Sequence, residues 1–401
     1  MKTIQDPVHG YVEVDEKILP LLDSEPVQRL RHIKQLGFSN LVYPGANHTR
    51  FEHSLGTMHL ARLMGINLGL SKDEILLVAS SALLHDIGHG PFSHATEPLM
   101  EKYLGKSHQE IDSLIQNGCL LEKLSAMNID PADVCSMVMG EHPLSGIIHG
   151  ELDVDRMDYL LRDAHYTGVP YGTVDAHRLI HSTSLTDKGL VLKENGINAA
   201  ESLLIARTLM RPAVYFHHVS RIAESMIKYA AVRHLEETKF EYINEFLLMD
   251  DWEFALELKR SPSSVSAKLI ENLYSRNLYK RALYIGMDQV RFSSIQRMIE
   301  LKDERRIADS VCEAAGVEDF EVLVDIPPIP SVMSVEVQVR NHNNLVSLED
   351  LSPLTATLND TRKSQWRMGI YTTPENRKNV EQAAYEVLNI EKMTKQDKLI
   401  I

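Results

Sequence analysis

Histidines are concentrated in one part of this 401-residue sequence. Seven of the 18 lie between residues 48 and 108, where an even spread would place about three. They are His48, His53, His59, His85, His89, His94 and His108. Histidine titrates near neutral pH and is the commonest protein ligand of metal ions. This segment is therefore a candidate for acid–base or metal chemistry.

A His-Asp dipeptide, His85-Asp86, ends a predicted helix. Ser71 and Glu74 form a capping box at the start of that helix, and its end is expected near Gly88. Because His85 continues the apolar face, we expect it to point into the protein. A buried histidine beside a buried aspartate is costly unless a partner such as a divalent cation stabilises both. The alternative is a core histidine that is capped by the neighbouring carboxylate.

A second helix is predicted downstream, and it carries two different stripes. Asp155, Tyr159 and Asp163 recur every four residues, so they share one face. The other stripe is apolar and consists of Met157, Leu160, Leu161 and Ala164. Two carboxylates and a phenol on one face are typical of a helix that faces a ligand. A solvated acidic face is the alternative.

The elements that would position these residues are mainly helical. Residues 1–15 alternate around a turn at residues 6–10 and predict a β-hairpin. Helices dominate from about 17 to 236, and the helix over 197–237 should bend at Pro212. Strand-like runs then follow at 321–324, 334–339 and 367–372, with a helix at 374–389. We expect a helical catalytic domain over residues 1–240 with the hairpin at its start, followed by a smaller α+β lobe over 241–401 that serves oligomerisation or regulation.

Composition narrows the class of protein. The chain holds 42 Lys+Arg and 56 Asp+Glu, a net charge of −14, which argues against duplex nucleic acid as a partner. The longest apolar stretch is about half of the ~20 residues that a membrane span needs. Three scattered cysteines without a CxxC pair favour a reducing compartment. We therefore expect a globular, cytoplasmic protein.

Together these residues carry a resemblance. His53, the pair His85-Asp86 and Asp155 resemble the H…HD…D signature of the HD superfamily of metal-dependent phosphohydrolases. Residues 6–10, 28–37 and 44–56 are similar to the deoxynucleoside triphosphate (dNTP) triphosphohydrolases of that superfamily, and the likeness is continuous from about residue 1 to 235. The resemblance implies a helical HD fold and hydrolysis of dNTP to deoxynucleoside and triphosphate.

The resemblance also implies which residues bind metal and which are catalytic. His53, His85, Asp86 and Asp155 match the metal ligands of the family. Such a nitrogen-containing set suits Mn, Fe, Zn or Ni better than Mg alone, although Mg is also expected to accompany the nucleotide. The catalytic positions are His94 and His108, with Glu97 where relatives have Asp, and His89 is expected near a second metal or a phosphate oxygen. For His89 and His94 the alternative is helix-end capping.

Substrate and effector residues follow by the same matching. Arg50, Arg156 and Arg207 match positions that contact the triphosphate, although a surface salt bridge is the alternative for each arginine. The sugar is assigned to Gln35, Tyr159 and Asp163 and the base to Tyr215, and Leu36 is a further candidate substrate-binding residue. Lys2, Asp23, Gln28 and Arg31 match some positions of an allosteric nucleotide site. The resemblance further implies a homo-oligomer, dimer or tetramer, that is regulated by GTP or dNTP.

Two other functions remain open on the sequence. One is an HD nucleotidase or phosphodiesterase that acts on another nucleotide. The other is a nucleotide-binding regulator that has kept the fold without turnover, because a fold match does not fix the chemistry.

Overall fold

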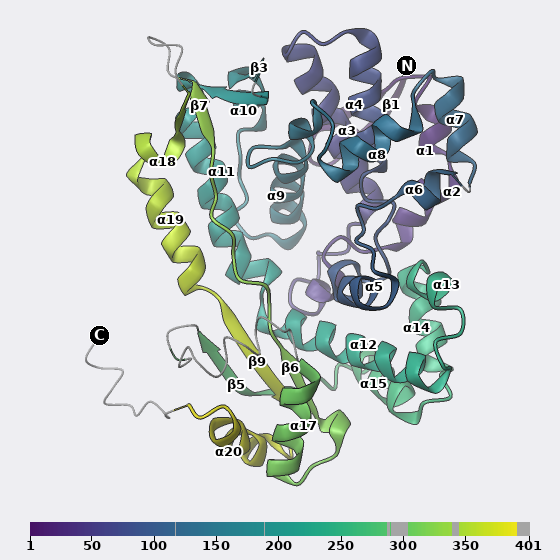
Figure 1. Ribbon diagram of the computed structural model, residues 1–401, viewed down its shortest axis with the longest axis vertical. Helices are drawn as coiled ribbons and strands as arrows, with labels where there is room; N and C mark the ends of the chain where they lie inside the picture. The colour runs from purple at the N-terminus through teal and green to yellow at the C-terminus, as the bar shows by residue number, and fades with distance from the viewer. Residues whose placement is uncertain (117, 188, 287–288, 290–303, 339–344, 391–401) are drawn as a thin grey trace. The chain divides into compact units, whose positions relative to one another are not determined.

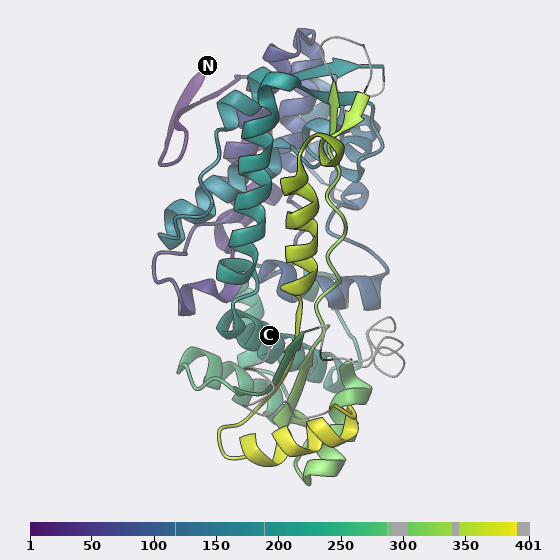
Figure 2. The same cartoon turned by 90° about the vertical axis from the view of Figure 1, so that its left-hand side faces the viewer.

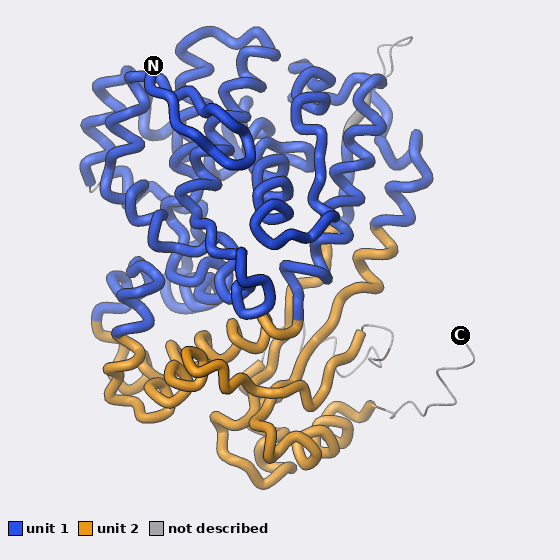
Figure 3. Tube along the Cα trace, turned by 180° about the vertical axis from the view of Figure 1, so that it is seen from behind, with its two compact units in different colours: residues 1–217, 242–256, 332–358 blue, residues 218–241, 257–331, 359–401 orange. Residues whose placement is uncertain are grey.

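The computed structural model describes residues 1–116, 118–187, 189–286, 289, 304–338 and 345–390. The chain forms two compact units, which are coloured separately in Figure 3. Unit 1 consists of residues 1–217, 242–256 and 332–358, and unit 2 of residues 218–241, 257–331 and 359–401. Each unit is therefore assembled from segments that are distant in the sequence.

Unit 1 is built around three helices. They are α3 (Arg50–Asn67), α4 (Lys72–Leu84) and α9 (Val154–Thr167), and α3 packs against both of the others (Figure 1). Further helices of this unit are α1 (Leu19–Leu22), α2 (Glu25–Arg29), α5 (Glu97–Leu104), α6 (Asp112–Gln116), α7 (Leu120–Ala126), α8 (Pro131–Met139), α10 (Ala176–Ser182), α11 (Ile197–Met210), α13 (Ile243–Leu247) and α18 (Leu348–Leu351). The predicted mainly helical fold is confirmed.

Local sequence signals explain where the three helices begin. The predicted capping box of Ser71 and Glu74 is present at the start of α4, and an equivalent box begins α3. The Asp153 carboxylate accepts the backbone N–H of Arg156 at 2.7 Å and caps α9. The α4 helix ends at Leu84, four residues earlier than expected. Gly88 instead permits a close approach, because a Cβ there would lie 2.1 Å from the carbonyl oxygen of His108.

The predicted N-terminal hairpin is confirmed. Strands β1 (Lys2–Asp6) and β2 (Gly10–Val14) pair antiparallel, and the register runs from Lys2 opposite Val14 to Asp6 opposite Gly10. Figure 2 shows this pair in purple beside the N-terminus. Val12 and Val14 are buried, so one side of β2 joins the core of unit 1.

A four-stranded sheet in unit 1 joins two distant parts of the chain. Its order is β3 (Thr183–Thr186), β4 (Gly189–Lys193), β7 (Glu336–Gln338) and β8 (Leu345–Ser347). The β3–β4 hairpin was not predicted. The predicted strand over 334–339 is present as β7, which pairs parallel with β4, while residue 339 lies outside the described residues. Parallel pairing across about 140 residues leaves no local signal in the sequence.

The helix predicted over 197–237 with a bend at Pro212 is divided in two at that proline. The α11 helix ends at Met210, a π-helical turn spans Arg211–Tyr215, and α12 runs from His218 to Glu237. Proline lacks a backbone N–H and its ring clashes with the preceding turn, so a regular α-helix does not continue through it.

Unit 2 contains an antiparallel sheet of three strands. The order is β5 (Lys280–Gly286), β9 (Arg367–Thr372) and β6 (Val322–Asp325), so the expected strands over 321–324 and 367–372 are present. Its helices include α12, α15 (Ser264–Tyr274), α17 (Glu304–Ala315) and α20 (Arg377–Val387). The last of these is the helix expected over 374–389. The α14 (Asp251–Lys259) and α19 (Pro353–Ser364) helices contain residues of both units.

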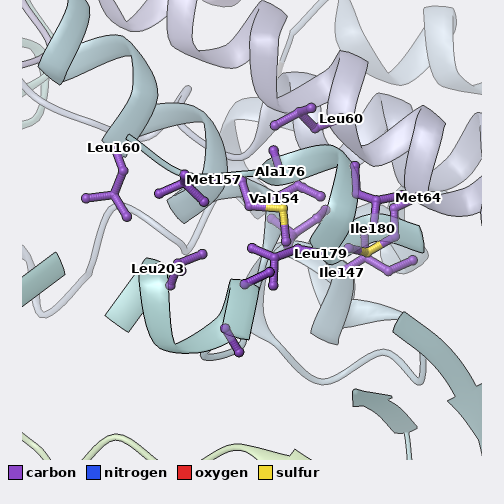
Figure 4. Packing of buried hydrophobic residues seen from close by; sticks show 14 of the residues in the cluster. Leu60, Met64, Ile147, Val154, Met157, Leu160, Ala176, Leu179, Ile180 and Leu203 are labelled. Atoms are coloured by element: carbon purple, nitrogen blue, oxygen red, sulfur yellow. The ribbon is translucent and has the colours of Figure 1, made fainter. Parts of the chain in front are cut away.

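The main core of unit 1 lies against α3 and α9. Figure 4 shows side chains from these helices, from α10 and from α11 packed together. They include Leu60, Met64, Met157, Leu160, Leu179 and Leu203, all of which are at most 1% exposed. The core therefore fixes the helices that carry the candidate site. None of the described helices is both long enough and apolar enough to span a membrane.

Candidate metal centre and active-site pocket

The residues of the expected metal centre come from three helices of unit 1. His53 lies on α3, His85 and Asp86 follow the end of α4, and Asp155 lies in the first turn of α9. The α3 and α9 helices approach closely at Gly56, where a Cβ would lie 1.9 Å from Asp158 Oδ1. A larger residue at this position would separate the two helices that carry the candidate ligands.

The four side chains converge. One ligand atom from each of His53, His85 and Asp86 lies within 4.8 Å of the others. Asp155 Oδ1 lies 2.9 Å from His53 Nε2 and 3.7 Å from His85 Nε2. His53, His85 and Asp86 are at most 5% exposed. The sequence prediction that His85 points inward is confirmed.

The hydrogen bonds of this cluster fit a cation. His85 Nδ1–H donates to the carbonyl of Ala82 at 2.7 Å, which leaves Nε2 as the nitrogen that can face a cation. That Nε2 is buried and has no hydrogen-bond partner among the described residues. His53 Nδ1–H donates to Asp158 at 2.8 Å, and its Nε2 lies 2.9 Å from Asp155 Oδ1. Burial lowers the pKa of His53, but these two carboxylates raise it to about 10, so the site attracts positive charge. Imidazole nitrogens and carboxylates together suit a divalent transition metal.

A second group of titratable residues adjoins the first. His94 Nδ1 lies 2.8 Å from Glu97 Oε2, and the other carboxylate oxygen of Glu97 accepts a hydrogen bond from His108. His108 also stacks on His89, with ring centroids 3.9 Å apart. Burial opposes ionisation of Glu97, but the bonds from His108 and His94 hold its pKa below the ordinary value. The longer Glu arm therefore reaches both histidines.

Both groups open into one pocket of about 270 Å³. It is lined by Gln35, Arg50, His53, His85, Asp86, His89, His94, His108, Gln109, His149, Gly150, Asp153, Asp155, Arg156 and Tyr159. Most of the expected metal and catalytic residues, and several of the substrate residues, thus share a single space.

Two arginines of this pocket are held by carboxylates. Arg50 Nη1 donates to Asp86 at 2.6 Å, whereas its Nη2 is buried without a hydrogen-bond partner among the described residues. Arg156 Nη1 donates to Asp153 at 2.6 Å. Burial raises the pKa of Tyr159, which also lines the pocket, to about 12. The phenol therefore stays neutral at physiological pH.

Other expected substrate residues do not line this pocket. Asp163 accepts hydrogen bonds from His48 at 2.8 Å and from Tyr215 at 2.9 Å. Arg207 pairs with Glu151, and Leu36 packs against the hydrophobic core. Burial raises the pKa of Tyr215 well above its ordinary value. The predicted stripe on α9 is therefore divided, because Asp155 and Tyr159 face the pocket and Asp163 does not.

The candidate effector residues lie near the start of the chain. Lys2, Asp23 and Arg31 are exposed, and Gln28 is half-buried. Arg31 Nε donates to Gln28 Oε1 at 2.8 Å, and its guanidinium lies 3.5 Å from the ring centroid of Phe51. These contacts connect two of the four candidates directly.

Several residues that touch the site were not singled out from the sequence. Asp158 contacts His53, and His149 and Gln109 line the pocket. The i,i+4 spacing of Asp158 and Arg162 was a signal, because such pairs form salt bridges on helices. His149 had no local signal, since it precedes α9 in an irregular segment.

Comparison with known proteins gives the same picture. Residues 50–163 match the HD domain and residues 174–399 match the HD-associated region. The chain is 37% identical to an uncharacterised protein of Methanocaldococcus jannaschii, over 95% of this chain and 81% of that protein. It is 32% identical to a protein of Dictyostelium discoideum named as a deoxynucleoside triphosphate triphosphohydrolase SAMHD1 homologue, over 73% of this chain and 62% of that protein.

A solved structure agrees with these matches. A phosphohydrolase from Bacteroides thetaiotaomicron superposes with a TM-score of 0.71 at 26% identity, and the superposition covers 93% of this chain and 99% of that one. The two family matches agree with the cluster of His53, His85 and Asp86 in the structure. The chain therefore belongs to the HD-domain phosphohydrolase family.

Proposed function

We propose that this protein is a metal-dependent hydrolase that converts dNTP to deoxynucleoside and inorganic triphosphate. The observation that carries the proposal is one pocket that contains two different chemical groups. One is a buried cluster of side chains that could hold a cation, with an unpartnered imidazole nitrogen among the described residues. The other is the carboxylate-linked pair of His94 and His108. Hydrolysis at phosphorus needs both functions.

We assign the divalent cation to His53, His85, Asp86 and Asp155. When bound, the cation supplies a water of lowered pKa and offsets negative charge on the phosphoryl oxygens. The donor set favours Mn, Fe, Zn or Ni, and a further Mg is expected to arrive with the nucleotide.

The protein residues supply the remaining chemistry. A water oxygen bonds to the α-phosphorus as the bond from that phosphorus to the 5′-oxygen breaks. His94, which is oriented by Glu97, gives a proton to the departing 5′-oxygen, so deoxynucleoside and triphosphate are released. Arg50 lines the pocket, and its buried Nη2 has no hydrogen-bond partner among the described residues, so it could donate to a phosphoryl oxygen. Arg156 lines the same pocket and could bind another phosphoryl oxygen. The phenol of Tyr159 would pack against the deoxyribose, where a 2′-hydroxyl would clash.

Residues outside the pocket need a rearrangement to reach the substrate. Arg207 must leave Glu151 to bind a phosphate, and the shared hydrogen bonds of Asp163 and Tyr215 must open toward the sugar and base. The Dictyostelium discoideum relative is named as a deoxynucleoside triphosphate triphosphohydrolase, and this name supports dNTP as the substrate class.

An assay with identified products tests the proposal. The purified protein is incubated with Mn²⁺ and each of the four dNTPs, with and without GTP, and the products are separated by ion exchange. We expect deoxynucleoside and intact triphosphate, and we expect ribonucleotides to react much more slowly. Orthophosphate or pyrophosphate alone would favour an HD nucleotidase or phosphodiesterase. Binding without any turnover would favour a silent regulator.

The remaining assignments are proposals of the same kind. Residues 1–240 are assigned as the catalytic domain and 241–401 as a lobe for oligomerisation or regulation. Lys2, Asp23, Gln28 and Arg31 are assigned to an effector site for GTP or dNTP in a dimer or tetramer. The three unpaired cysteines agree with a cytoplasmic location. Light scattering with and without GTP measures the assembly state.

A further inference from the structure

The turn of the N-terminal hairpin is fixed by its own side chain. Asp6 Oδ1 accepts the backbone N–H groups of Val8 at 2.9 Å and of His9 at 2.8 Å. Gly10 follows at φ +75°, a conformation that favours glycine. Although this turn lies at the tip of a two-stranded hairpin, the His9 side chain is only 7% exposed. The hairpin therefore delivers an imidazole into the interior of unit 1.

His9 touches the carboxylate that orients a proposed metal ligand. His9 Nε2 lies 2.6 Å from Asp158 Oδ1, and His53 Nδ1 lies 2.8 Å from Asp158 Oδ2. A carboxylate accepts hydrogen bonds, so both imidazoles donate to Asp158. The bond from Nδ1 orients His53 with its Nε2 toward Asp155 Oδ1, 2.9 Å away.

A second connection runs in parallel. Arg162 donates from Nε to Asp158 at 2.9 Å and from Nη1 to Asp6 at 2.8 Å, and all three side chains are buried. The turn is thus joined to α9 by His9 and again by Asp6. At Gly56 of the neighbouring α3 helix, a Cβ would lie 1.9 Å from Asp158 Oδ1, so this carboxylate has little room to move.

We propose that His9 is a positioning residue for the cation site, acting on His53 through Asp158, and that seating of the hairpin and cation binding are coupled. Partners behind a ligating histidine fix its tautomer and orientation, and their loss typically costs about 10–100-fold in metal affinity. The coupling is reciprocal, so the cation must stabilise the seated hairpin by the same factor. The inference concerns cation binding, so it stands whether or not the substrate is a dNTP.

The first test measures Mn²⁺ affinity on the metal-free full-length protein by titration calorimetry. We expect His9→Ala to weaken binding about 10-fold or more. His9→Gln places an amide N–H near the position of Nε2 and should restore most of the affinity. Tyr11→Ala is the matched control, because Tyr11 lies on the same hairpin and is 66% exposed. Wild-type affinity in His9→Ala would overturn the proposal, as would equal losses in the Ala and Gln variants.

The second test uses the wild-type chain and needs no variant to fold. Hydrogen exchange of residues 2–14 is measured without metal and with saturating Mn²⁺. We expect exchange in the hairpin to slow on Mn²⁺ addition by about the factor found for the affinity loss. Unchanged exchange over these residues would show that the hairpin is seated independently of the cation, and the coupling would be wrong. Neither readout depends on turnover, so an inactive protein would refute only the proposed function.

Discussion

Unit 1 and unit 2 each hold a group of buried or half-buried charged side chains, and the two groups differ in whether every polar atom has a partner. In unit 2, Arg221 of α12 donates to Asp325 through Nε at 3.0 Å and through Nη2, and to Glu224 through Nη1 at 2.8 Å. Tyr371 donates to the same Asp325 at 3.1 Å. Both carboxylate oxygens and all three guanidinium nitrogens have partners.

The cluster of unit 1 is incomplete in comparison. His85 Nε2, His89 Nδ1 and Arg50 Nη2 are buried and have no hydrogen-bond partner among the described residues. All three residues line the same pocket. A buried polar atom without a partner costs about 1–3 kcal/mol, so several around one space indicate a ligand that is bound in the working protein. A buried charge group that is complete, as in unit 2, stabilises the fold and indicates no ligand.

The largest effect should come from removing a proposed ligand in unit 1. We expect Asp86→Ala to abolish activity and to lower Mn²⁺ affinity by more than about 100-fold, beyond the loss typical of supporting residues. Metal content after dialysis and calorimetry measure this. Asp73→Ala, which changes an exposed aspartate of α4, is the control. Full metal occupancy in Asp86→Ala would show that the ligand assignment is wrong.

A change in the neighbouring histidine group should separate chemistry from metal binding. We expect His108→Ala to slow turnover about 10²–10⁴-fold, as is typical for loss of general acid–base catalysis, and to leave the Mn²⁺ content unchanged. Glu97 would lose one of its two histidine partners. His181→Ala, at an exposed position, should behave like the wild type. A parallel fall in metal content would place His108 among the cation ligands instead.

The matched change in unit 2 should alter stability and leave the cation site unaffected. Asp325→Asn leaves Arg221, whose side chain is 20% exposed, without its main charge partner, so the cost should lie below the ~3–5 kcal/mol typical of breaking a fully buried pair. Urea unfolding followed by tryptophan fluorescence reports it, because Trp366 of unit 2 is 1% exposed whereas Trp252 is 64% exposed. Glu224→Gln should cost less, because a second partner remains. If Asp325→Asn weakened Mn²⁺ binding, the distinction between the two groups would fail.

Sequence patterns were informative where the signal is local. The capping box of α4 and the hairpin around residues 6–10 each depend on residues within one turn of each other, and both are confirmed. Pro212 marked the place where the predicted helix changes course, although the structure has a break there rather than a bend. The stripe on α9 predicted a shared face, and two of its three members do face the pocket. The assignment of His53, His85, Asp86 and Asp155 as ligands stays a prediction, although the structure brings them together.

The remaining features depend on contacts between distant segments. The parallel pairing of β4 with β7, the approach of His9 to Asp158 and the ion pair of Arg207 with Glu151 join residues that are about 50 to 150 positions apart. Side-chain type at one position does not determine such a partner, because the tertiary packing selects it. The hydrogen bond between His48 and Asp163 is another contact of this kind, and the assignment of Asp163 to the sugar stays a prediction.

The smallest effect should come from another buried nitrogen of unit 1. His59 of α3 has an Nδ1 without a hydrogen-bond partner in the described part of the chain. Burial, together with His9, Arg62 and His177, lowers the pKa of His59 from 6.5 to about 4, against an opposing effect of Asp6. The unfolded chain therefore binds more protons than the folded one between pH 4 and 6.5. It follows that the free energy of unfolding falls as the pH drops through this range.

The variant His59→Gln should remove that part of the pH dependence. Each pKa unit corresponds to about 1.4 kcal/mol in the free energy of unfolding. Because the His59 ring is partly exposed, solvent screening should reduce the pH-dependent contribution to about 1–2 kcal/mol. Urea unfolding at pH 7 and pH 4.5 measures the difference between the variant and the wild type. The variant should gain relative stability at the lower pH, whereas His165→Gln, at an exposed position, should not. If the variant and the wild type differed equally in free energy of unfolding at both pH values, His59 would be protonated at pH 4.5 in the folded protein. Its Nδ1 would then have a partner, as the atoms of the Arg221 group in unit 2 do, and would not count among the unpartnered atoms of unit 1.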